Sequence, residues 1–338
     1  MSRLLHHPAA VAWRELRPER LTPRCIEIVR VIENRAIYRL HGVGCGGSGV
    51  IAKRCWLSTA SIEHTVYDEI LPRLPFTTLR YYGFVPEDDE FAWLFLEDVG
   101  RVRFSRLVAE QRTLVGRWLA LMHTFAPSVE ASAGLPERGQ RHYLEHLRAA
   151  RRNIRQNLAN PAVSGSDVDL LWSVIALCDD LELHWNELEE CFEGAPATLV
   201  HGDFRPKNVH LRTIDSGAGV FVLDWETAGW GPPAVDLAPA RGPHSARHVD
   251  IETYISIAHE SWANLDSQMI GRLVAAGTIF RRLAAVDWAS SNLAFDDVSL
   301  PVARLRVYRS ELLEAKQAAM PGQRLADTRT DGLDEPRA

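Results

Sequence analysis

The sequence predicts an α+β protein with a small strand-rich N-terminal lobe, residues 1–99, and a larger, mainly helical C-terminal lobe, residues 100–320. Two patterns predict this division. Before residue 100, β-branched and aromatic residues gather in short runs separated by turns, as in strands. Beyond about residue 103, apolar residues recur every three or four positions, as in amphipathic helices. The last segment, 321–338, is polar and charged, and we expect it to be a disordered tail.

The N-terminal lobe is expected to contain strands and one helix. The helix is Ile62–Leu74, whose apolar residues recur every four positions. A glycine-rich segment, Gly42–Gly49, joins the second strand to the third. The expected strands are Ile26–Val31, Ala36–Leu40, Val50–Cys55, Leu79–Val85 and Phe91–Leu96.

The C-terminal lobe is predicted to be helical apart from a strand-rich island, Thr198–Trp225. Within the island, Val209–Arg212 and Val220–Leu223 form a hairpin whose turn is Thr213–Gly219. The expected helices are Leu107–His123, Tyr143–Leu158, Val168–Phe192, Ile251–Ala263, Met269–Trp288 and Val302–Ala319.

The composition is that of an ordinary soluble globular protein, with 46% hydrophobic and 24% charged residues. A net charge of -6 provides no basic surface for nucleic acid. The N-terminus lacks a secretory apolar region, and no apolar stretch is long enough to span a bilayer. The five cysteines form no C-x-x-C pair, which favours reduced thiols. We therefore expect a cytoplasmic protein, a monomer or weak dimer, that binds neither nucleic acid nor membrane.

Three polar side chains of the island are expected to lie together. A hairpin places the start of its first strand beside the end of its second, so Asn208 and Asp224 should be neighbours, with Asp203 in the loop just before them. Two carboxylates and an amide oxygen suit Mg²⁺. Phosphoryl transfer needs this set, because one carboxylate accepts the proton of the attacking hydroxyl while the other ligands hold the metal that neutralises the phosphates.

A metallohydrolase is the alternative from another class of enzyme. Its ligands would be His201, Asp203, His210 and Asp224. Strand alternation argues against it, because His210 should point to the face opposite Val209 and Leu211. This alternative also leaves Lys53 and Asn208 without a role.

The island resembles the aminoglycoside phosphotransferase family, whose relatives phosphorylate choline, homoserine and other small alcohols. Its H-G-D-x-x-x-x-N motif is His201–Asn208, and an apolar pair followed by D-W-E is Val222–Glu226. The family pattern G-P-P-x-x-D-L-A is present as Gly231–Ala238. The resemblance covers roughly residues 20–310 and implies a bilobal protein-kinase-like fold, with nucleotide bound by the N-terminal lobe and catalysis in the C-terminal lobe.

The resemblance implies a role for each residue of the motif. Asp203 would be the catalytic base, with Asn208 and Asp224 as Mg²⁺ ligands. Arg205 stands where many protein kinases carry a lysine that meets the γ-phosphate, so it either grips phosphate or forms a surface ion pair. Asp236 either supports the catalytic loop or caps the next helix. The motif histidine is expected to orient the loop.

The N-terminal lobe is expected to supply the nucleotide clamp. Val50–Lys53 resembles the V-A-I-K strand of kinases, which makes Lys53 the phosphate anchor unless it is simply a solvent-facing lysine. Its partner is Glu63 or Glu69, and the family pattern E-x-x-x-Y-x-x-x-L favours Glu63. Glu97, in the pair Glu97-Asp98, falls where the family connects its lobes and binds adenine.

The segment Gly42–Gly47 satisfies the phosphate-loop pattern G-x-G-x-x-G but is interpreted as a flexible connection. A dinucleotide site would need a helix directly after it, whereas Val50–Cys55 is predicted to be a strand. In kinases the glycine loop lies between the first two strands, where this chain has the glycine-free segment Ile32–Arg35. Whether ATP or GTP is preferred is left open.

The expected function is transfer of the γ-phosphate of ATP or GTP to a hydroxyl of an antibiotic, in the manner of antibiotic resistance. A metabolic sugar or amino-alcohol kinase and a catalytically silent pseudokinase with a binding role are the alternatives. Carboxylates of the last helices could meet a cationic acceptor, although solvated helix faces explain most of them. They are Asp250, Glu252, Glu260, Asp266 and Asp287.

Overall fold

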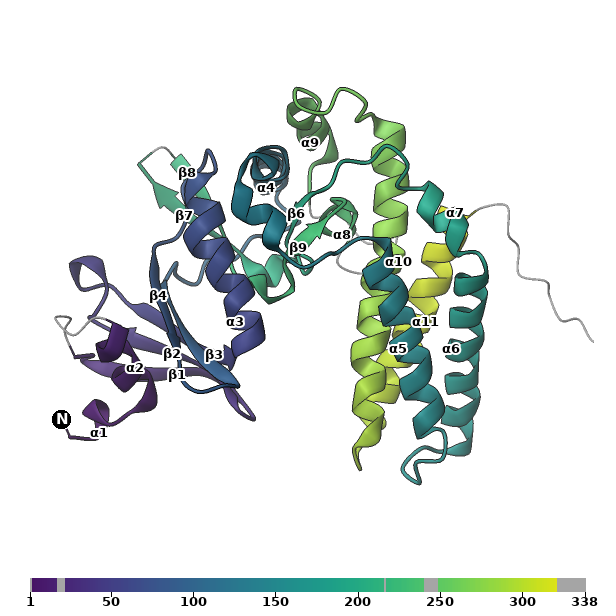
Figure 1. Ribbon diagram of the computed structural model, residues 1–338, viewed down its shortest axis with the longest axis horizontal. Coiled ribbons are helices and arrows are strands. Elements are labelled where there is room, and N and C mark those ends of the chain that lie inside the picture. The colour runs from purple at the N-terminus through teal and green to yellow at the C-terminus, as the bar shows by residue number, and fades with distance from the viewer. Residues whose placement is uncertain (1, 17–21, 216, 240–248, 321–338) are drawn as a thin grey trace, which may run out of the picture.

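The computed structural model describes residues 2–16, 22–215, 217–239 and 249–320, so the expected tail lies outside it. The chain has the two parts that the sequence predicts. An antiparallel sheet near the N-terminus lies at the left of Figure 1, and a bundle of long helices lies at the right. The α+β, kinase-like bilobal architecture is thereby confirmed. Among the described residues, no helix is both long enough and apolar enough to span a membrane.

The N-terminal sheet has the strand order β1-β2-β3-β5-β4, with each neighbouring pair antiparallel. The strands are β1 (Cys25–Ile32), β2 (Arg35–His41), β3 (Val50–Trp56), β4 (Tyr81–Pro86) and β5 (Phe91–Glu97), close to their predicted bounds. On the central strand β3, Val50 and Ala52 are buried against the N-terminal helices, whereas Ile51 and Lys53 line a cavity on the other face. This alternation aims Lys53 at the site.

Two short N-terminal helices, α1 (Ser2–Leu5) and α2 (Pro8–Leu16), were not predicted. Trp13 of α2 is fully buried and packs on Tyr82 and Phe95, with ring centroids 5.5 and 5.3 Å away. A nine-residue helix is marginal in isolation, so its packing on the sheet supplies most of its stability. The predicted helix after β3 begins earlier than expected, as α3 (Leu57–His64), and continues through the π-helical segment Thr65–Ile70.

The C-terminal part consists mainly of helices. They are α4 (Ala109–Phe125), α5 (Gln140–Asn157), α6 (Gly165–Leu183), α7 (Trp185–Glu190), α8 (Ala234–Leu237), α9 (Ile251–Ala258), α10 (Ser267–Ser291) and α11 (Ser299–Ala319). The prediction of one helix over Val168–Phe192 is wrong, because the chain leaves helical geometry at His184 (φ −105°, ψ 24°) and divides it into α6 and α7.

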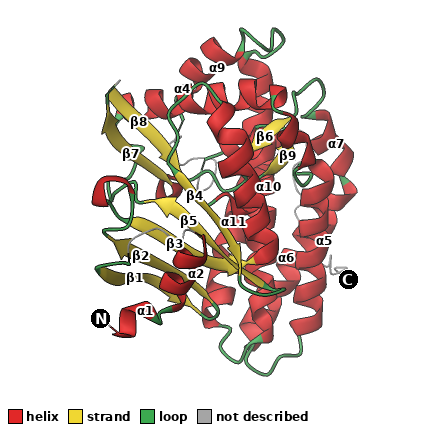
Figure 2. Ribbon diagram, turned by 60° about the vertical axis from the view of Figure 1, so that its left-hand side comes forward, coloured by secondary structure: helices red, strands yellow, loops and turns green. Residues whose placement is uncertain are grey.

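The strand-rich island is present and contributes to two small sheets. They are formed by β6 (Thr198–Val200) with β9 (Gly229–Gly231), and by β7 (Val209–Ile214) with β8 (Gly217–Val222). The turn between β7 and β8 is shorter than predicted, because the strands pair as far as Ile214 and Gly217. Figure 2 shows the β7–β8 hairpin next to the N-terminal sheet, with α5, α6 and α7 on the other side. The segment after β5 runs along β7, where Phe104 N donates to Val209 O (3.0 Å).

Candidate active site

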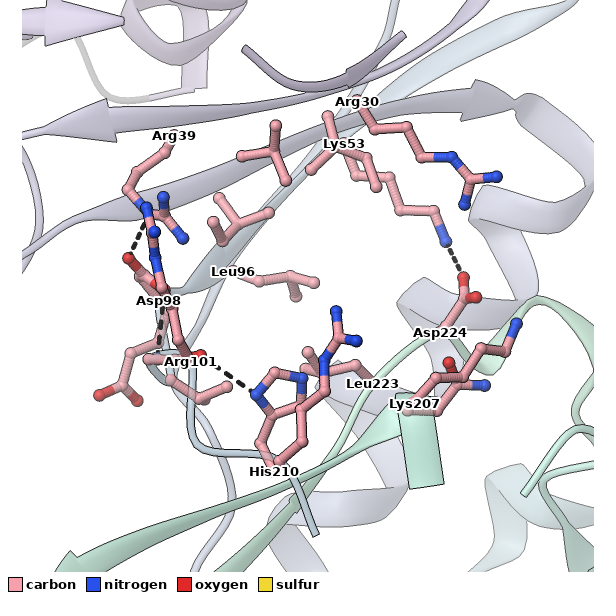
Figure 3. Close-up of a pocket in the computed structure, with 18 of the residues that line it drawn as sticks. Arg30, Arg39, Lys53, Leu96, Asp98, Arg101, Lys207, His210, Leu223 and Asp224 are labelled. Carbon is pink, nitrogen blue, oxygen red and sulfur yellow. Dashed lines mark hydrogen bonds and ion pairs between the residues drawn. The ribbon is translucent and has the colours of Figure 1, made fainter. Parts of the chain in front are cut away.

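A cavity of about 680 Å³ lies between the N-terminal sheet and the β7–β8 hairpin. Strands β1, β2, β3 and β5 form one wall. The other wall includes Lys207, Asn208, His210, Leu223 and Asp224. Figure 3 shows Lys53 and Asp224 approaching each other across this space, with Lys207 beside Asp224. Cavities of this size hold small-molecule ligands and cofactors.

Lys53 connects the two walls of the cavity. Its Nζ lies 2.5 Å from a carboxylate oxygen of Glu63 on α3 and 2.5 Å from one of Asp224. The predicted Lys53–Glu63 pair is thus observed, and Glu69 is exposed instead. Burial by itself would lower the pKa of Lys53, but attraction to Glu63, Asp224 and Glu226 raises this pKa well above its usual value. The lysine is therefore protonated and not solvent-facing.

Glu63 differs from Lys53 in that its surroundings favour the neutral form of the side chain. It is completely buried, and burial with the nearby carboxylates of Asp224 and Glu226 raises its pKa to about 7, although the charge of Lys53 acts in the other direction. Only one of its oxygens is engaged, since Oε2 has no hydrogen-bond partner among the described residues. The site therefore holds more carboxylates than its one buried lysine can neutralise.

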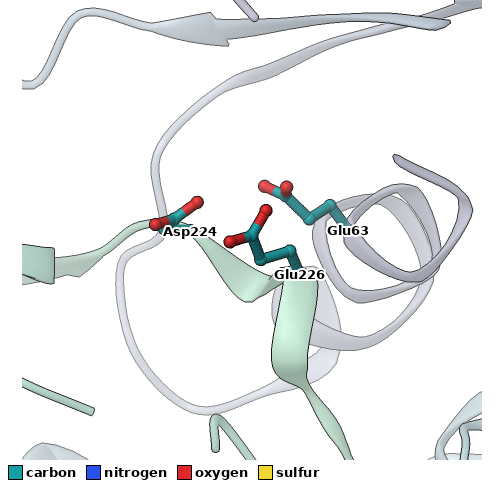
Figure 4. A group of neighbouring side chains, drawn as sticks. All are labelled: Glu63, Asp224 and Glu226. Carbon is teal, nitrogen blue, oxygen red and sulfur yellow. The ribbon is translucent and has the colours of Figure 1, made fainter. Parts of the chain in front are cut away.

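Three carboxylates converge beside Lys53, and they are drawn in Figure 4. Glu63, Asp224 and Glu226 each offer an oxygen within 4.8 Å of the others. Asp224 has left-handed backbone geometry (φ 70°, ψ 59°), which is uncommon outside glycine and is concentrated at functional sites. A cluster of oxygen donors with excess negative charge and an unpartnered buried oxygen fits Mg²⁺. Glu226 is the last residue of the D-W-E motif, and the sequence alone does not predict a role for it.

The loop after β6 is held from behind by Asp236. Its carboxylate accepts hydrogen bonds from the backbone N–H groups of His201 (2.7 Å) and Gly202 (3.0 Å), and it lies 3.4 Å from Nε2 of His123. Burial opposes its ionisation, but these hydrogen bonds and the charge of His123 hold the pKa of Asp236 below its usual value. The loop-supporting role expected for Asp236 is therefore observed. The helix-cap interpretation is wrong, because Pro233 precedes α8 and Asp236 lies within it.

Asp203 lies in this loop with both carboxylate oxygens engaged. Arg205 pairs with it through two nitrogens, Nη2 at 2.7 Å from Oδ2 and Nε next to Oδ1, while Lys207 Nζ lies 3.2 Å from Oδ2. Burial alone would raise the pKa of Asp203, but the Arg205 bond and the charges of Arg205, Lys207 and Arg281 hold it below its usual value. Asp203 is thus ionised at neutral pH, and Arg205 forms an ion pair that covers it.

Asn208 joins Asp203 to Asp224, as the hairpin argument predicts. Its Nδ2 donates to the backbone oxygen of Asp203 (3.0 Å) and to Oδ2 of the same residue (3.2 Å). Its backbone oxygen accepts from Leu223 N (2.9 Å), next to Asp224. Because the amide NH₂ is engaged, the side-chain oxygen is the atom left to meet a cation. His201, also buried, donates from Nε2 to Leu223 O (3.0 Å) and so contacts the same junction.

Glu97 lies where the two parts of the chain connect and lines the cavity. Its Oε1 accepts from Arg212 of β7 (2.6 Å) and its Oε2 from the backbone N–H of Arg80 (2.9 Å). The neighbouring Asp98 pairs with Arg39 of β2 (2.6 Å). These contacts tie the acidic pair to the walls of the cavity, next to the position expected for adenine.

The glycine-rich segment lies outside this cavity. Gly42–Gly49 connects β2 to β3 and contains a short 3₁₀ turn, Cys45–Gly47, whose first N–H donates to the Tyr82 hydroxyl (3.2 Å). None of its residues lines the cavity. The β1–β2 turn does approach Lys53, since Ile32 and Arg35 at its ends line a smaller recess that also includes Lys53 and Asp224. The interpretation of the glycines as a connection agrees with this arrangement.

The geometry argues against the metallohydrolase. His210 Nδ1 bonds Gly100 O (3.1 Å), and the ring lies on the opposite side of β7 from the buried Val209. Among the described residues, no cluster of three or more His, Cys, Asp or Glu side chains placed to share one metal ion contains a histidine.

Most carboxylates expected to face a cationic acceptor have structural partners. Asp250 accepts from Thr253 N (2.9 Å) and Asp266 from Met269 N (2.7 Å), so they cap α9 and α10. Asp287 on α10 pairs with His146 of α5 (2.7 Å).

A strand-rich lobe and a helical lobe, with an ion-paired lysine facing a carboxylate-lined loop between them, define a kinase-like phosphotransferase. The chain belongs to the phosphotransferase enzyme family, which residues 32–263 match. The resemblance and the enzyme class expected from the motifs are thereby confirmed. Curated protein sequences contain no match to this chain.

Solved structures share the fold at low sequence identity. The complex of APH(2")-IIia with GDP and kanamycin is 14% identical, with a TM-score of 0.60 over 90% of this chain and 99% of that chain. A microcompartment-associated aminopropanol kinase is 16% identical, with a TM-score of 0.59 over 89% and 94%. A Plasmodium vivax ethanolamine kinase is 13% identical, with a TM-score of 0.54 over 88% and 82%.

Proposed function

We propose that this protein transfers the γ-phosphate of ATP or GTP to a hydroxyl group of a small molecule, with Asp203 as the base. The observation that carries the proposal is the arrangement of Lys53, Asp203, Asn208 and Asp224 around one junction between the lobes. In the neighbour named APH(2")-IIia, a fold of this kind holds GDP and kanamycin together. Phosphoryl transfer relies mainly on positioning and charge stabilisation, which these groups are suited to provide.

Each of these side chains has a proposed role. Lys53, fixed by Glu63, binds the phosphates of the nucleotide in the large cavity. Asp203, ionised at neutral pH, accepts the proton of the acceptor hydroxyl as its oxygen attacks the γ-phosphorus. Arg205 must leave at least one oxygen of Asp203 for this to occur, and a γ-phosphate next to the loop is the anion that would draw the guanidinium away.

Mg²⁺ is the proposed cofactor. Asn208 and Asp224 would hold it through oxygen atoms, with Glu226 as a further carboxylate of the same cluster. When bound, Mg²⁺ neutralises the charge on the phosphates.

The charges near Asp203 constrain the acceptor. Neither Asp203 nor Arg205 lines the nucleotide cavity, so the acceptor reaches the base from another side. Arg281 of α10 donates to the backbone oxygen of Phe204 (3.0 Å), and its neighbour Arg282 pairs with Glu311 of α11 (2.6 Å). Arg205 and Arg282 are each paired with a carboxylate, whereas Arg281 donates to backbone oxygens, so of the three its charge is the one left to repel a cation and attract an anion. We therefore propose a neutral or anionic acceptor rather than a polycationic aminoglycoside, and among antibiotics an uncharged one.

A phosphate-transfer screen tests the function. Purified protein is supplied with Mg²⁺ and either ATP or GTP, and acceptors are grouped as cationic, neutral and anionic hydroxyl compounds, including kanamycin, aminopropanol, sugars and sugar acids. Asp203→Asn should lower turnover by about 10²–10⁴-fold while nucleotide binding and fold are retained. Asp169→Asn, at an exposed position of α6, is the matched control and should leave turnover unchanged.

The outcomes separate the alternatives. Full turnover by Asp203→Asn would contradict the assignment of the base. Nucleotide binding without transfer to any acceptor would favour the pseudokinase. Turnover that is greatest with kanamycin would contradict the inferred acceptor charge while leaving the kinase itself supported.

A further inference from the structure

Two histidines on α5 face α10, away from the junction that holds the proposed kinase site. His142 and His146 are four residues apart, so they lie one above the other on the same face of the helix. They line a cavity of about 370 Å³ together with Glu145 and Asp287. No step of the proposed phosphoryl transfer uses them.

The distance between the two imidazoles is that of a pair of metal ligands. Nε2 of His142 and Nε2 of His146 share a hydrogen bond of 3.2 Å, and the ring planes are 78° apart. Two nitrogens bound at about 2.0–2.1 Å to one tetrahedral Zn²⁺ lie about 3.3–3.4 Å from each other. The separation of the nitrogens therefore already matches that of two ligands of one ion. Binding would replace the shared proton and turn both lone pairs from each other to the metal.

A carboxylate supports one of the imidazoles from behind. Nδ1 of His146 lies 2.7 Å from Oδ2 of Asp287, which directs its proton to the carboxylate and leaves a lone pair on Nε2. Asn153 donates to the other oxygen of Asp287 (3.2 Å) and to Ser290 (3.3 Å), so the carboxylate is itself fixed. Carboxylate–histidine pairs of this kind orient metal ligands in proteins and raise their basicity.

The second imidazole packs beside the first. The ring of His142 lines the cavity together with His146, and its centroid lies 4.9 Å from that of the Tyr143 ring. The charged residues of the cavity lining balance, since Arg148 and Arg152 offset Glu145 and Asp287. Arg148 is further paired with Glu182 of α6 (2.6 Å). A divalent ion would therefore not meet a surplus of positive charge.

We propose that His142 and His146 form a binding site for a borderline transition-metal ion, Zn²⁺ or Ni²⁺, with Asp287 orienting His146 and water completing the coordination. Imidazole nitrogens favour such ions, whereas Mg²⁺ prefers oxygen. The α5–α10 site is thus chemically distinct from the oxygen cluster at Asp224. Glu145, on the same turn and largely exposed, is the nearest additional carboxylate on α5.

Calorimetric titration of the full chain with Zn²⁺ or Ni²⁺, without nucleotide, tests this proposal. The wild-type protein is expected to bind the ion. His142→Asn and His146→Asn should each reduce the affinity for it at least tenfold. Asp287→Asn should weaken the same binding by about 10–100-fold while both ligands remain. His184→Asn, a half-buried histidine paired with Asp180 on α6, is the control and should bind as the wild type does.

A second measurement covers the case of a poorly folded variant. The melting temperature of the wild type should rise when Zn²⁺ is added, because an ion that binds only the folded chain stabilises it. Circular dichroism reports whether each variant retains its helices. Unchanged affinity and stoichiometry in folded His142→Asn, or a wild type that neither binds Zn²⁺ nor gains stability from it, would overturn the proposal.

Discussion

Replacing Lys53 by Met removes the one buried cation from a cluster of carboxylates. Breaking a buried ion pair by removal of one partner costs about 3–5 kcal/mol, because the charge left behind is uncompensated. Here that charge is on Glu63, which is fully buried, and on Asp224. We expect the free energy of unfolding to fall by an amount in this range at alkaline pH.

The loss should depend on pH. The pKa of Glu63 is raised to about 7 in the folded protein, above its ordinary value of 4.5. The wild type therefore loses stability as the pH rises from about 4.5 to about 7, where the folded state must give up the proton. Lys53 acts to lower the pKa of Glu63. Without Lys53 this pKa is higher, so the free energy of unfolding continues to fall at higher pH, by about 1.4 kcal/mol for each unit by which the pKa rises. The difference between wild type and variant should thus be smaller at about pH 6 than at about pH 8.5.

Urea unfolding followed by tryptophan fluorescence, without nucleotide or Mg²⁺, measures this difference. Lys207→Met is the matched control, because Lys207 is about half exposed (49%) and its pair with Asp203 should contribute less than about 1 kcal/mol. The double variant Lys53→Met/Glu63→Gln should recover part of the lost stability at the higher pH. A loss below about 1 kcal/mol, or one of equal size at both pH values, would refute the view that Lys53 compensates buried carboxylates.

Three further changes test the loop, the covered base and the glycine segment. Asp236→Asn should cost about 2–3 kcal/mol in urea unfolding, since it weakens two charge-assisted hydrogen bonds. Because the folded pKa of Asp236 is lowered, its stabilisation is present above the ordinary carboxyl pKa and is lost as pH falls through the folded value, so the variant should show a shallower acid decline. Arg205→Met should move the acid limb of the pH profile of kcat/KM for the nucleotide to higher pH, because Asp203 of the free enzyme loses the partner that lowers its pKa, and an unmoved limb would contradict this. Gly46→Ala, at φ 63° with open space around it, should cost about 1–2 kcal/mol yet leave the KM for nucleotide unchanged, whereas a raised KM would mean that the segment contacts nucleotide.

Much of the candidate site was predictable because it depends on strand geometry. Hairpin pairing alone places Asn208 beside Asp224, and alternation along β3 aims Lys53 at the same space. These relations follow from backbone hydrogen bonding and need no knowledge of distant packing. The bounds of most strands and helices followed from local periodicity for the same reason.

Other features depend on tertiary contacts that a single sequence does not display. Glu226 lies in one cluster with Glu63 and Asp224, two residues after the left-handed backbone of Asp224, and local periodicity predicts neither feature. An arginine at position 205 can pair with a phosphate or with Asp203, and the motif does not decide between the two. In the structure Arg205 pairs with Asp203. Helix α2 (Pro8–Leu16) is short and gains its stability from the sheet beneath it.

The ion pairs that bridge the two lobes are both partly open to dissolved salt. Lys53 and Asp224 keep 12% and 34% of their side chains accessible to solvent, and Arg212 and Glu97, at the lobe connection, keep 35% and 22%. Each bridge therefore has one end that counter-ions can reach, and rising ionic strength should weaken both. The contact of Lys53 with the fully buried Glu63 lies within one lobe and is shielded from this screening.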